Sequence, residues 1–183
     1  MKTTALVILH PGFEEMEAVA PIDLLARANI EVTQASLTAE RLVKGKSGMT
    51  LLADCSLGDL LENQLFDTVI LPGGPGINEI RNHTDICKIF QRHHTAGKLV
   101  ACICAAPLLL LDAGIAEDLR YTAHPAARKE LPNAENTAFI LDGNILTSAG
   151  AGTATEFGLA LIETLKDRET RDRIADSICW RHD

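Results

Sequence analysis

Short runs of apolar, often β-branched residues alternate along this chain with longer stretches in which apolar residues recur with helical periodicity. The short runs predict β-strands over residues 4–10, 30–37, 49–53, 66–71, 98–103, 137–141 and 145–147. The longer stretches predict helices over residues 14–28 and 85–95, from about residue 105, and over 156–166 and 169–178. Pro21 lies inside the first of these helices and predicts either a kink or a fresh helix start at the proline.

The alternation of strands and helices predicts the fold class. At this spacing, strands join through helices as βαβ units, which build a mostly parallel sheet with helices on both faces. No repeat, low-complexity tract or linker divides the sequence, so we expect one doubly wound α/β domain over residues 1–183. Active sites in such sheets lie beyond the carboxyl ends of the strands. Here these are the segments that follow His10, Leu71 and Ile103.

Composition and charge narrow the classes of function. The 183 residues are 46% hydrophobic and carry a net charge of -8 without a cluster of basic residues, which argues against stable nucleic-acid binding. The apolar run over residues 99–111 is shorter than the roughly 18 residues of a membrane span and contains Pro107. No secretory signal is visible. Five cysteines without the spacing of a disulfide framework are typical of a reducing compartment, so we expect a cytoplasmic protein without membrane contact.

One cysteine stands where a predicted strand meets a predicted helix. Cys104 follows residues 98–103 directly and is flanked by the small residues Ala105 and Ala106, a pattern that resembles a nucleophile elbow. At a helix N-terminus, unpaired N–H groups and the helix dipole lower the pKa of a thiol. Cys102, two positions earlier, is expected to point into the packed face. The local pattern equally allows both cysteines to be core residues.

Three glutamates follow the first predicted strand. Glu14, Glu15 and Glu17 lie at another carboxyl end of the sheet, and we expect two of them to be on the solvated surface. A glutamate that turned into the crevice would lose solvation, and the pKa of its carboxyl would rise. Such a carboxyl could hydrogen-bond a thiolate or shuttle protons as a general acid or base.

Two glycine-rich segments also lie at strand ends. The turn PGGPG over residues 72–76 can present backbone N–H groups to an oxyanion, or it can be a sharp turn only; it lacks the Lys and Ser/Thr of a P-loop. The segment 148–153 departs from the dinucleotide fingerprint and is interpreted as a tight loop beside the site.

His124, in a loop, is either a surface residue or a base of the site. We predict no cofactor and, because no second Cys or His pair has zinc-site spacing, no metal.

Five motifs in order resemble the DJ-1/PfpI (ThiJ/PfpI) superfamily over nearly the full chain. ALVIL with PGFEEMEAVAPIDLLARANI comes first, followed by FDTVILPGG, VACICAAP, TAHP and LTSAGAGTATEFGLALIE. The sequence is most similar to the branch that contains the parkinsonism-associated protein deglycase and bacterial YajL. The resemblance implies a flavodoxin-like three-layer α/β sandwich and a homodimer with the site close to its interface.

The resemblance also implies roles for individual residues. Cys104 would be the nucleophilic, easily oxidised cysteine, and Glu17 the carboxyl that hydrogen-bonds it. His124 would lie near the sulfur and take part in catalysis. The oxyanion- and substrate-binding positions would be Gly73, Gly74 and Ala105.

The activity implied by the resemblance is that of a cofactor-independent glyoxalase or protein deglycase. Its substrate would be a small α-oxoaldehyde of the methylglyoxal type or a glycated protein. The same cysteine would also serve an oxidative-stress sensor or a redox-regulated chaperone, and this alternative stays open. A class I amidotransferase or intracellular peptidase would need a His and acid pair after the elbow, where the chain offers only His124-Pro125. The segment GKS over residues 45–47 stands where close relatives carry Cys-Ser-Arg, which bears on substrate preference.

Overall fold

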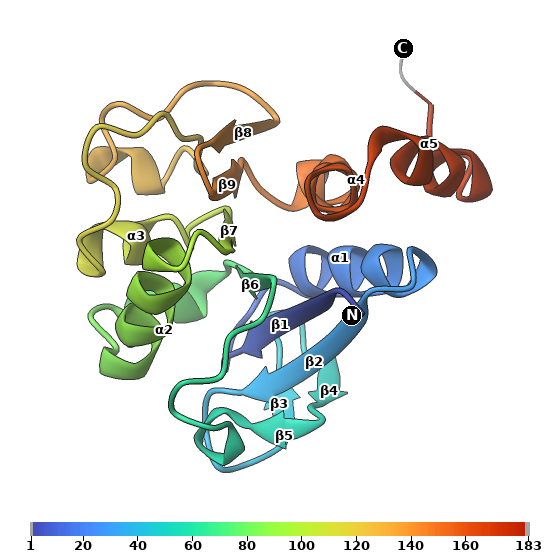
Figure 1. The fold of residues 1–183 in the computed structure, drawn as a ribbon. Helices are drawn as coiled ribbons and strands as arrows, with labels where there is room; N and C mark the ends of the chain where they lie inside the picture. The colour runs from blue at the N-terminus through green and yellow to red at the C-terminus, as the bar shows by residue number, and fades with distance from the viewer. Residues whose placement is uncertain (1, 182–183) are drawn as a thin grey trace.

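A seven-stranded sheet forms the centre of the structure, a computed structural model that describes residues 2–181 (Figure 1). The strand order is β5-β2-β1-β6-β7-β9-β8, and neighbouring strands pair in parallel except β8 with β9. The strands are β1 (Thr4–Leu9), β2 (Glu31–Ser36), β5 (Cys55–Ser56), β6 (Thr68–Leu71), β7 (Leu99–Ile103), β8 (Phe139–Asp142) and β9 (Ile145–Ser148). A separate antiparallel pair consists of β3 (Leu42–Lys44) and β4 (Thr50–Leu52).

Helices cover both faces of this sheet, which is the middle of three layers (Figure 1). One face carries α1 (Glu15–Arg27), α4 (Ala154–Leu165) and α5 (Arg168–Ser177), and the other carries α2 (Thr84–Thr95) and α3 (Leu108–Asp112). Alternate strand residues point to opposite faces, so β1 contributes Val7 to the core under α1 and Ile8 to the core under α2. The predicted flavodoxin-like sandwich with a mostly parallel sheet is confirmed.

Short 3₁₀ helices occupy several of the connections. They are Leu57–Asp59, Pro75–Ile80, Ala127–Lys129 and Ala151–Thr153. The second of them follows the glycine turn after β6, and the fourth lies in the predicted tight loop after β9. Of the helices found within residues 2–181, none has both the length and the apolar character that crossing a membrane requires.

The helix α1 runs through Pro21 without a fresh start. A proline has no N–H, so the carbonyl of Glu17, four positions earlier, loses its usual helix partner. Pro21 is buried against α4, where a glycine permits close approach: a Cβ built on Gly158 would lie 2.5 Å from Leu24 Cδ1 and 3.4 Å from Pro21 Cα. This contact holds α1, and therefore the first turn that carries Glu17, against its neighbour.

Three differences from the predicted elements have local causes. The sequence of β3, LVK, has one buried residue between two exposed ones and therefore shows no apolar run, and β5 is only two residues long. The third helix begins at Leu108 instead of about residue 105, because tight turns follow the end of β7. In these turns Ala106 N–H donates to the Ile103 carbonyl at 3.0 Å, and Leu108 N–H donates to the Ala105 carbonyl at 3.1 Å.

Candidate active site

Three loops meet at the carboxyl edge of the sheet, because β1, β6 and β7 are parallel neighbours within it. The loop after β1 leads into α1, whose first turn contains Glu17. The loop after β6 is the glycine turn 72–76, and Cys104 follows β7 directly. The structure thus brings Glu17, Gly73 and Cys104 into contact, although they come from three separate parts of the chain.

Cys104 stands on a strained backbone turn with φ of +66°, a value that residues other than glycine seldom adopt. Its N–H donates to the Ser148 carbonyl at 2.9 Å, and its own carbonyl accepts the His124 N–H at 2.8 Å. These bonds hold the turn between β9 and the loop before β8. The residue is half-buried, whereas Cys102 lies in the core under α2 with 0% exposure, and burial raises the pKa of that thiol well above its ordinary value.

Glu17 is withdrawn from water almost completely, with 1% of its surface exposed. Its Oε2 atom accepts the Gly73 N–H at 2.9 Å, and the carboxyl also hydrogen-bonds the Cys104 thiol. Burial raises the pKa of Glu17 to about 7, although the hydrogen bonds from Cys104 and Gly73 act in the opposite direction. A carboxyl that titrates near neutral pH is suited to accept and return protons.

Glu14 and Glu15 are buried as well, so the prediction that two of the three glutamates lie on the solvated surface is wrong. The loop between β3 and β4 covers them. In it, Ser47 N–H donates to Glu15 Oε1 at 2.7 Å, and Lys46 forms an ion pair with Glu14. Contacts between segments some thirty residues apart therefore remove from water two side chains that local sequence places on a surface.

Gly73 occupies a position that has no room for a side chain. A Cβ built there would lie 2.7 Å from Cys104 Cβ and 2.8 Å from the Ile103 carbonyl oxygen. The N–H of Gly73 is taken up by Glu17, whereas the N–H groups of Gly74 and Ala105 hydrogen-bond the sulfur of Cys104. Of the three predicted oxyanion positions, two therefore face the sulfur and one faces the carboxyl.

The Cys104 thiol resists ionisation while Glu17 is charged. Burial, followed by the adjacent Glu17 carboxylate, raises the pKa of Cys104 to about 12, and the N–H groups of Gly74 and Ala105 only partly offset this. The prediction that a helix N-terminus lowers the pKa of this thiol is wrong. The helix α3 begins further along, at Leu108, and the nearest charge is an anion.

Burial raises the pKa of both Cys104 and Glu17, and the Glu17 anion raises that of Cys104 further, so the pair keeps one proton after the first has left. Protonation of the Glu17 carboxyl removes the negative charge that opposes the thiolate. When the retained proton lies on Glu17, the sulfur is a thiolate. The amides of Gly74 and Ala105 then face the charged sulfur and stabilise it. The arrangement can move one proton between sulfur and oxygen.

His124 is exposed, and its ring lies close to the pair. A Cβ built on Gly150 would be 3.5 Å from His124 Cδ2 and 3.9 Å from Glu17 Oε1, so the ring and the carboxyl flank the same glycine. The Nδ1 atom of His124 accepts the Ala126 N–H at 3.2 Å, which places the proton of the neutral ring on Nε2. Within the described residues, no side-chain hydrogen bond joins His124 to Cys104 or Glu17.

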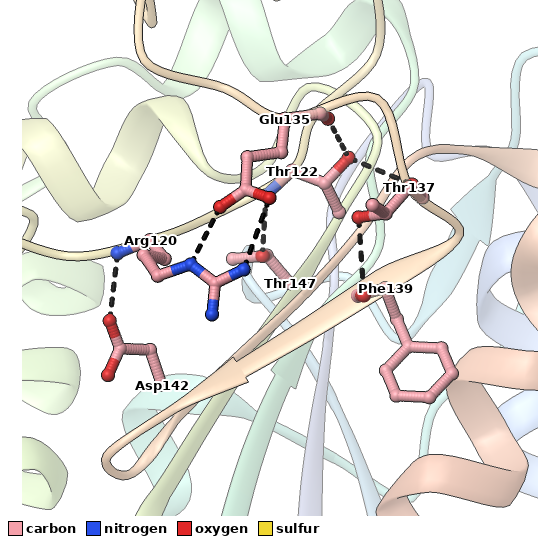
Figure 2. A network of polar contacts seen from close by, with 7 residues as sticks. All are labelled: Arg120, Thr122, Glu135, Thr137, Phe139, Asp142 and Thr147. Carbon is pink, nitrogen blue, oxygen red and sulfur yellow. Dashed lines mark hydrogen bonds and ion pairs between the residues drawn. The ribbon is translucent and has the colours of Figure 1, made fainter.

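Polar contacts fasten the loop between α3 and β8 to the edge of the sheet (Figure 2). The Arg120 guanidinium pairs with Glu135, with Nε and Oε1 2.8 Å apart, and the Arg120 N–H donates to Asp142 at 2.8 Å. The Thr122 N–H donates to the Thr147 hydroxyl at 2.9 Å, and the Thr122 hydroxyl donates to the Glu135 carbonyl at 2.8 Å. These contacts hold in place the loop that contains His124 of the TAHP motif.

Two residues near the site were not among the predicted site residues. Lys46, with 44% of its side chain exposed, extends its positive charge toward Glu17 and Cys104 as well as Glu14. His10 is fully buried against the glycine turn. Its signal in the sequence is a polar residue at the end of the apolar run TALVILH, whereas Lys46 is marked only by the GKS departure.

Across residues 2–181, no group of three or more His, Cys, Asp or Glu side chains is placed to hold a metal ion.

The fold and the cysteine–glutamate pair define an α/β protein with a cysteine on a strand-end elbow. The chain belongs to the DJ-1/PfpI family, whose sequence model matches residues 3–164. It is 37% identical to protein dj-1beta of Drosophila melanogaster over 97% of each chain, and 31% identical to the glutathione-independent glyoxalase DJR-1.2 of Caenorhabditis elegans over 96% of each. The crystal structure of Drosophila DJ-1beta matches all of this chain with a TM-score of 0.93 and 35% identity, and all of its own length is covered. The predicted family is confirmed.

Proposed function

We propose that the protein is a cysteine-dependent, cofactor-independent glyoxalase and protein deglycase that acts on α-oxoaldehydes of the methylglyoxal type or on their adducts. One observation carries the proposal: the carboxyl of Glu17, almost completely buried, hydrogen-bonds the Cys104 thiol, and burial raises the pKa of this carboxyl to about 7. The similarity to a nematode relative named as a glutathione-independent glyoxalase supports the same class of reaction.

In the proposed reaction, the Cys104 thiolate adds to the aldehyde carbon of methylglyoxal, and the aldehyde oxygen takes up a proton to give a hemithioacetal. Glu17 then removes the proton from that carbon and returns one to the adjacent carbonyl carbon, by way of an enediolate. This transfer converts the hemithioacetal to a thioester of lactate. Water cleaves the thioester, releasing lactate and restoring the thiol. Electrons balance, because one carbon of the substrate is oxidised while its neighbour is reduced.

The surroundings of the pair suit these steps. The N–H groups of Gly74 and Ala105 face the sulfur and can stabilise negative oxygen on the carbon attached to it. Gly73 holds the Glu17 carboxyl in place through its own N–H. His124, exposed beside Gly150, is assigned to assist proton transfer at the mouth of the site. The same chemistry on an adduct of a protein amine or thiol would be deglycation.

The experiment is lactate formation from methylglyoxal by wild type, Cys104→Ser and Cys102→Ala, with a buffer-only control. Cys102→Ala is the matched control, because it changes a cysteine two residues away that lies in the core. We expect lactate from wild type and Cys102→Ala only. Lactate from Cys104→Ser at the wild-type rate would contradict the mechanism. Release of methylglyoxal adducts from a treated peptide, measured with an aldehyde scavenger present, separates deglycation from removal of the free aldehyde.

The second candidate function is an oxidative-stress sensor or redox-regulated chaperone. It is favoured by a half-buried sulfur that has amide donors on one side and a protonatable carboxyl on the other, a setting that can hold a sulfinate. Intact mass after mild peroxide separates the two functions. A sensor without enzymatic activity gains two oxygens on Cys104 and forms no lactate.

A homodimer is also proposed. Large apolar side chains are exposed on α1, on the β3–β4 pair and in the loop that joins these two strands, which contacts the start of α1. They include Met16, Met49 and Leu52, with 58%, 54% and 61% exposure. Exposed apolar groups gathered in this way are typical of an association surface. Light scattering on the purified protein tests it, and a mass of one chain at micromolar concentration would contradict it.

A further inference from the structure

His10 lies between two backbone carbonyls at the carboxyl end of β1. The residue is fully buried, its Nε2 atom is 3.1 Å from the Pro72 carbonyl oxygen, and its Nδ1 atom is 3.1 Å from the Pro11 carbonyl oxygen. The ring is also wedged in place, because a Cβ built on Gly76 would lie 2.8 Å from Nδ1. A buried imidazole in this position has few orientations available.

Of the carbonyls that His10 contacts, that of Pro72 belongs to the same peptide group as the N–H that binds Glu17. The carbonyl oxygen of Pro72 faces His10 Nε2, and the N–H of Gly73, across the same peptide bond, donates to Glu17 Oε2 at 2.9 Å. One planar peptide unit thus stands between the imidazole and the carboxyl. A shift of either end turns the other.

We propose that His10 is a positioning residue of the site, which donates its Nε2 proton to the Pro72 carbonyl and thereby orients and strengthens the hydrogen bond from Gly73 to Glu17. This inference rests on the proposed function only in taking Glu17 as the group that moves protons. Hydrogen bonds in a chain polarise one another, so a donor on the carbonyl makes the N–H of that peptide a better donor. Hydrogen bonds to a charged acceptor are the stronger kind, so the gain is larger for the Glu17 carboxylate than for its acid form.

The consequence is that His10 opposes the effect of burial on Glu17. Burial raises the pKa of Glu17, and a stronger bond from Gly73 lowers it. The other titratable or charged groups that act on Glu17 are Cys104 after β7, Glu14 at the start of α1 and Lys46 from the β3–β4 loop. The hydrogen-bond partners of the His10 ring are the backbone carbonyls of Pro72, Pro11 and Gly73, and burial lowers its pKa, so the ring is neutral at neutral pH with one proton to donate.

Two variants separate the ring nitrogens. His10→Gln places an amide N–H near the position of Nε2, toward Pro72, and His10→Asn places one near Nδ1, toward Pro11. His10→Phe keeps the volume and removes both donors. His93→Gln, which changes another fully buried histidine far from the pair in sequence, is the control for a general loss of stability.

The measurement is NMR of the whole protein, with no substrate present. The ¹³C shift of the Glu17 carboxyl is followed against pH and assigned by its absence in Glu17→Gln, and the amide proton of Gly73 reports its hydrogen bond directly. We expect His10→Gln and His93→Gln to titrate as wild type. In His10→Asn and His10→Phe the Glu17 midpoint should rise by roughly half a pH unit or more, and the Gly73 amide proton should move upfield.

An unchanged midpoint in His10→Asn would overturn the proposal, and this outcome is readable even if His10→Phe does not fold. A raised midpoint in His10→Gln would overturn the assignment of the proton to Nε2. Because the measurement needs no turnover, the two proposals fail separately. If wild type forms no lactate but the Glu17 midpoint rises in His10→Asn, the proposed activity is wrong and the role of His10 stands. If wild type forms lactate but the midpoint does not rise in His10→Asn, the role of His10 is wrong and the proposed activity stands.

Discussion

His10 and His93 are both fully buried, yet they serve regions of the molecule with different demands. His93 lies beside the start of β6, where its Nδ1–H donates to the Ile89 carbonyl at 2.8 Å and its Nε2 accepts the Phe66 N–H at 3.2 Å. One neutral tautomer satisfies both contacts. His10, at the opposite edge of the sheet, faces two carbonyl oxygens, and no neutral tautomer satisfies both.

Two cysteines, one in β7 and one directly after it, show the same contrast between a fixed proton and one that takes part in a titrating pair. Cys102 is surrounded by core side chains and keeps its proton, whereas the Cys104 thiol hydrogen-bonds a carboxyl, Glu17, whose pKa is raised to about 7. The amino edge and the core therefore fix each proton in one place, and the carboxyl edge keeps more than one arrangement accessible. This difference distinguishes a buried polar group that stabilises the fold from one that carries chemistry, and it predicts which substitutions change rate and which change stability.

The largest expected effect is on the proton that the pair shares. Glu17→Gln keeps the size of the side chain but cannot take up a proton, so lactate formation should fall on the order of 10² to 10⁴-fold. Glu14→Gln is the matched control, because Glu14 is buried nearby but is paired with Lys46. Initial rates of lactate release at saturating methylglyoxal test the prediction, and a Glu17→Gln rate within a few-fold of wild type would contradict it.

The same substitution should stabilise the fold at high pH. The pKa of Glu17 is about 7 in the folded protein, above the ordinary value of 4.5 that applies when the chain is unfolded. The folded state therefore binds more protons between these values, so the stability that protonated Glu17 contributes is fully present below pH 4.5 and is lost as pH rises through 7. The pKa difference corresponds to about 3 kcal/mol at most.

Urea unfolding of wild type and Glu17→Gln at pH 5 and pH 8 measures the contribution of Glu17 to the free energy of unfolding. The free energy of unfolding of wild type should fall between the two pH values relative to that of the variant. If both proteins lose the same free energy, Glu17 is not buried in its charged form and the contrast between the two edges of the sheet is lost.

A smaller effect is expected at the amino edge. His93→Leu leaves the Phe66 N–H buried without its acceptor, which should cost about 1–3 kcal/mol of unfolding free energy. Burial lowers the pKa of His93, so its contribution to stability is present above pH 6.5 and is lost as pH falls below that value. Thermal unfolding across pH 5 to 8 checks both statements. The Glu17 titration should not move, and a shift there would show that the two edges are coupled.

The fold could be predicted because the buried strands are continuous apolar runs, which a local pattern reveals. The segment FDTVIL and the segment before Cys104 both appear as strands in sequence and in the structure. β3 escaped prediction because a strand with a single buried residue has no such pattern. The position of Cys104 at the end of β7 followed from the same pattern, since a strand end needs only its own residues to be located.

The properties of the site were less accessible than its residues. Burial of Glu14 and Glu15 depends on the β3–β4 loop, and the partner of His10 is a carbonyl 62 residues away. The sign of the Cys104 pKa shift depends on the charge of Glu17, which lies in another loop. Each is a contact between distant parts of the chain, and no periodicity within either segment encodes it.

The smallest predicted effect distinguishes the exposed charge of Lys46 from the buried hydrogen bonds of His10. Lys46 lowers the pKa of Glu17 through its charge alone, whereas His10 acts through a peptide group. Lys46→Gln should raise the pH midpoint of lactate formation by only a few tenths of a unit, and Lys46→Arg should leave it unchanged. Because Lys46 is partly exposed, added salt should abolish the difference between Lys46→Gln and wild type. The shift in His10→Asn should persist in salt, because Pro72 and Gly73 are buried and buried interactions are screened much less than exposed ones. Equal salt sensitivity of the two shifts would mean that both residues act as simple charges, and the distinction between them would fail.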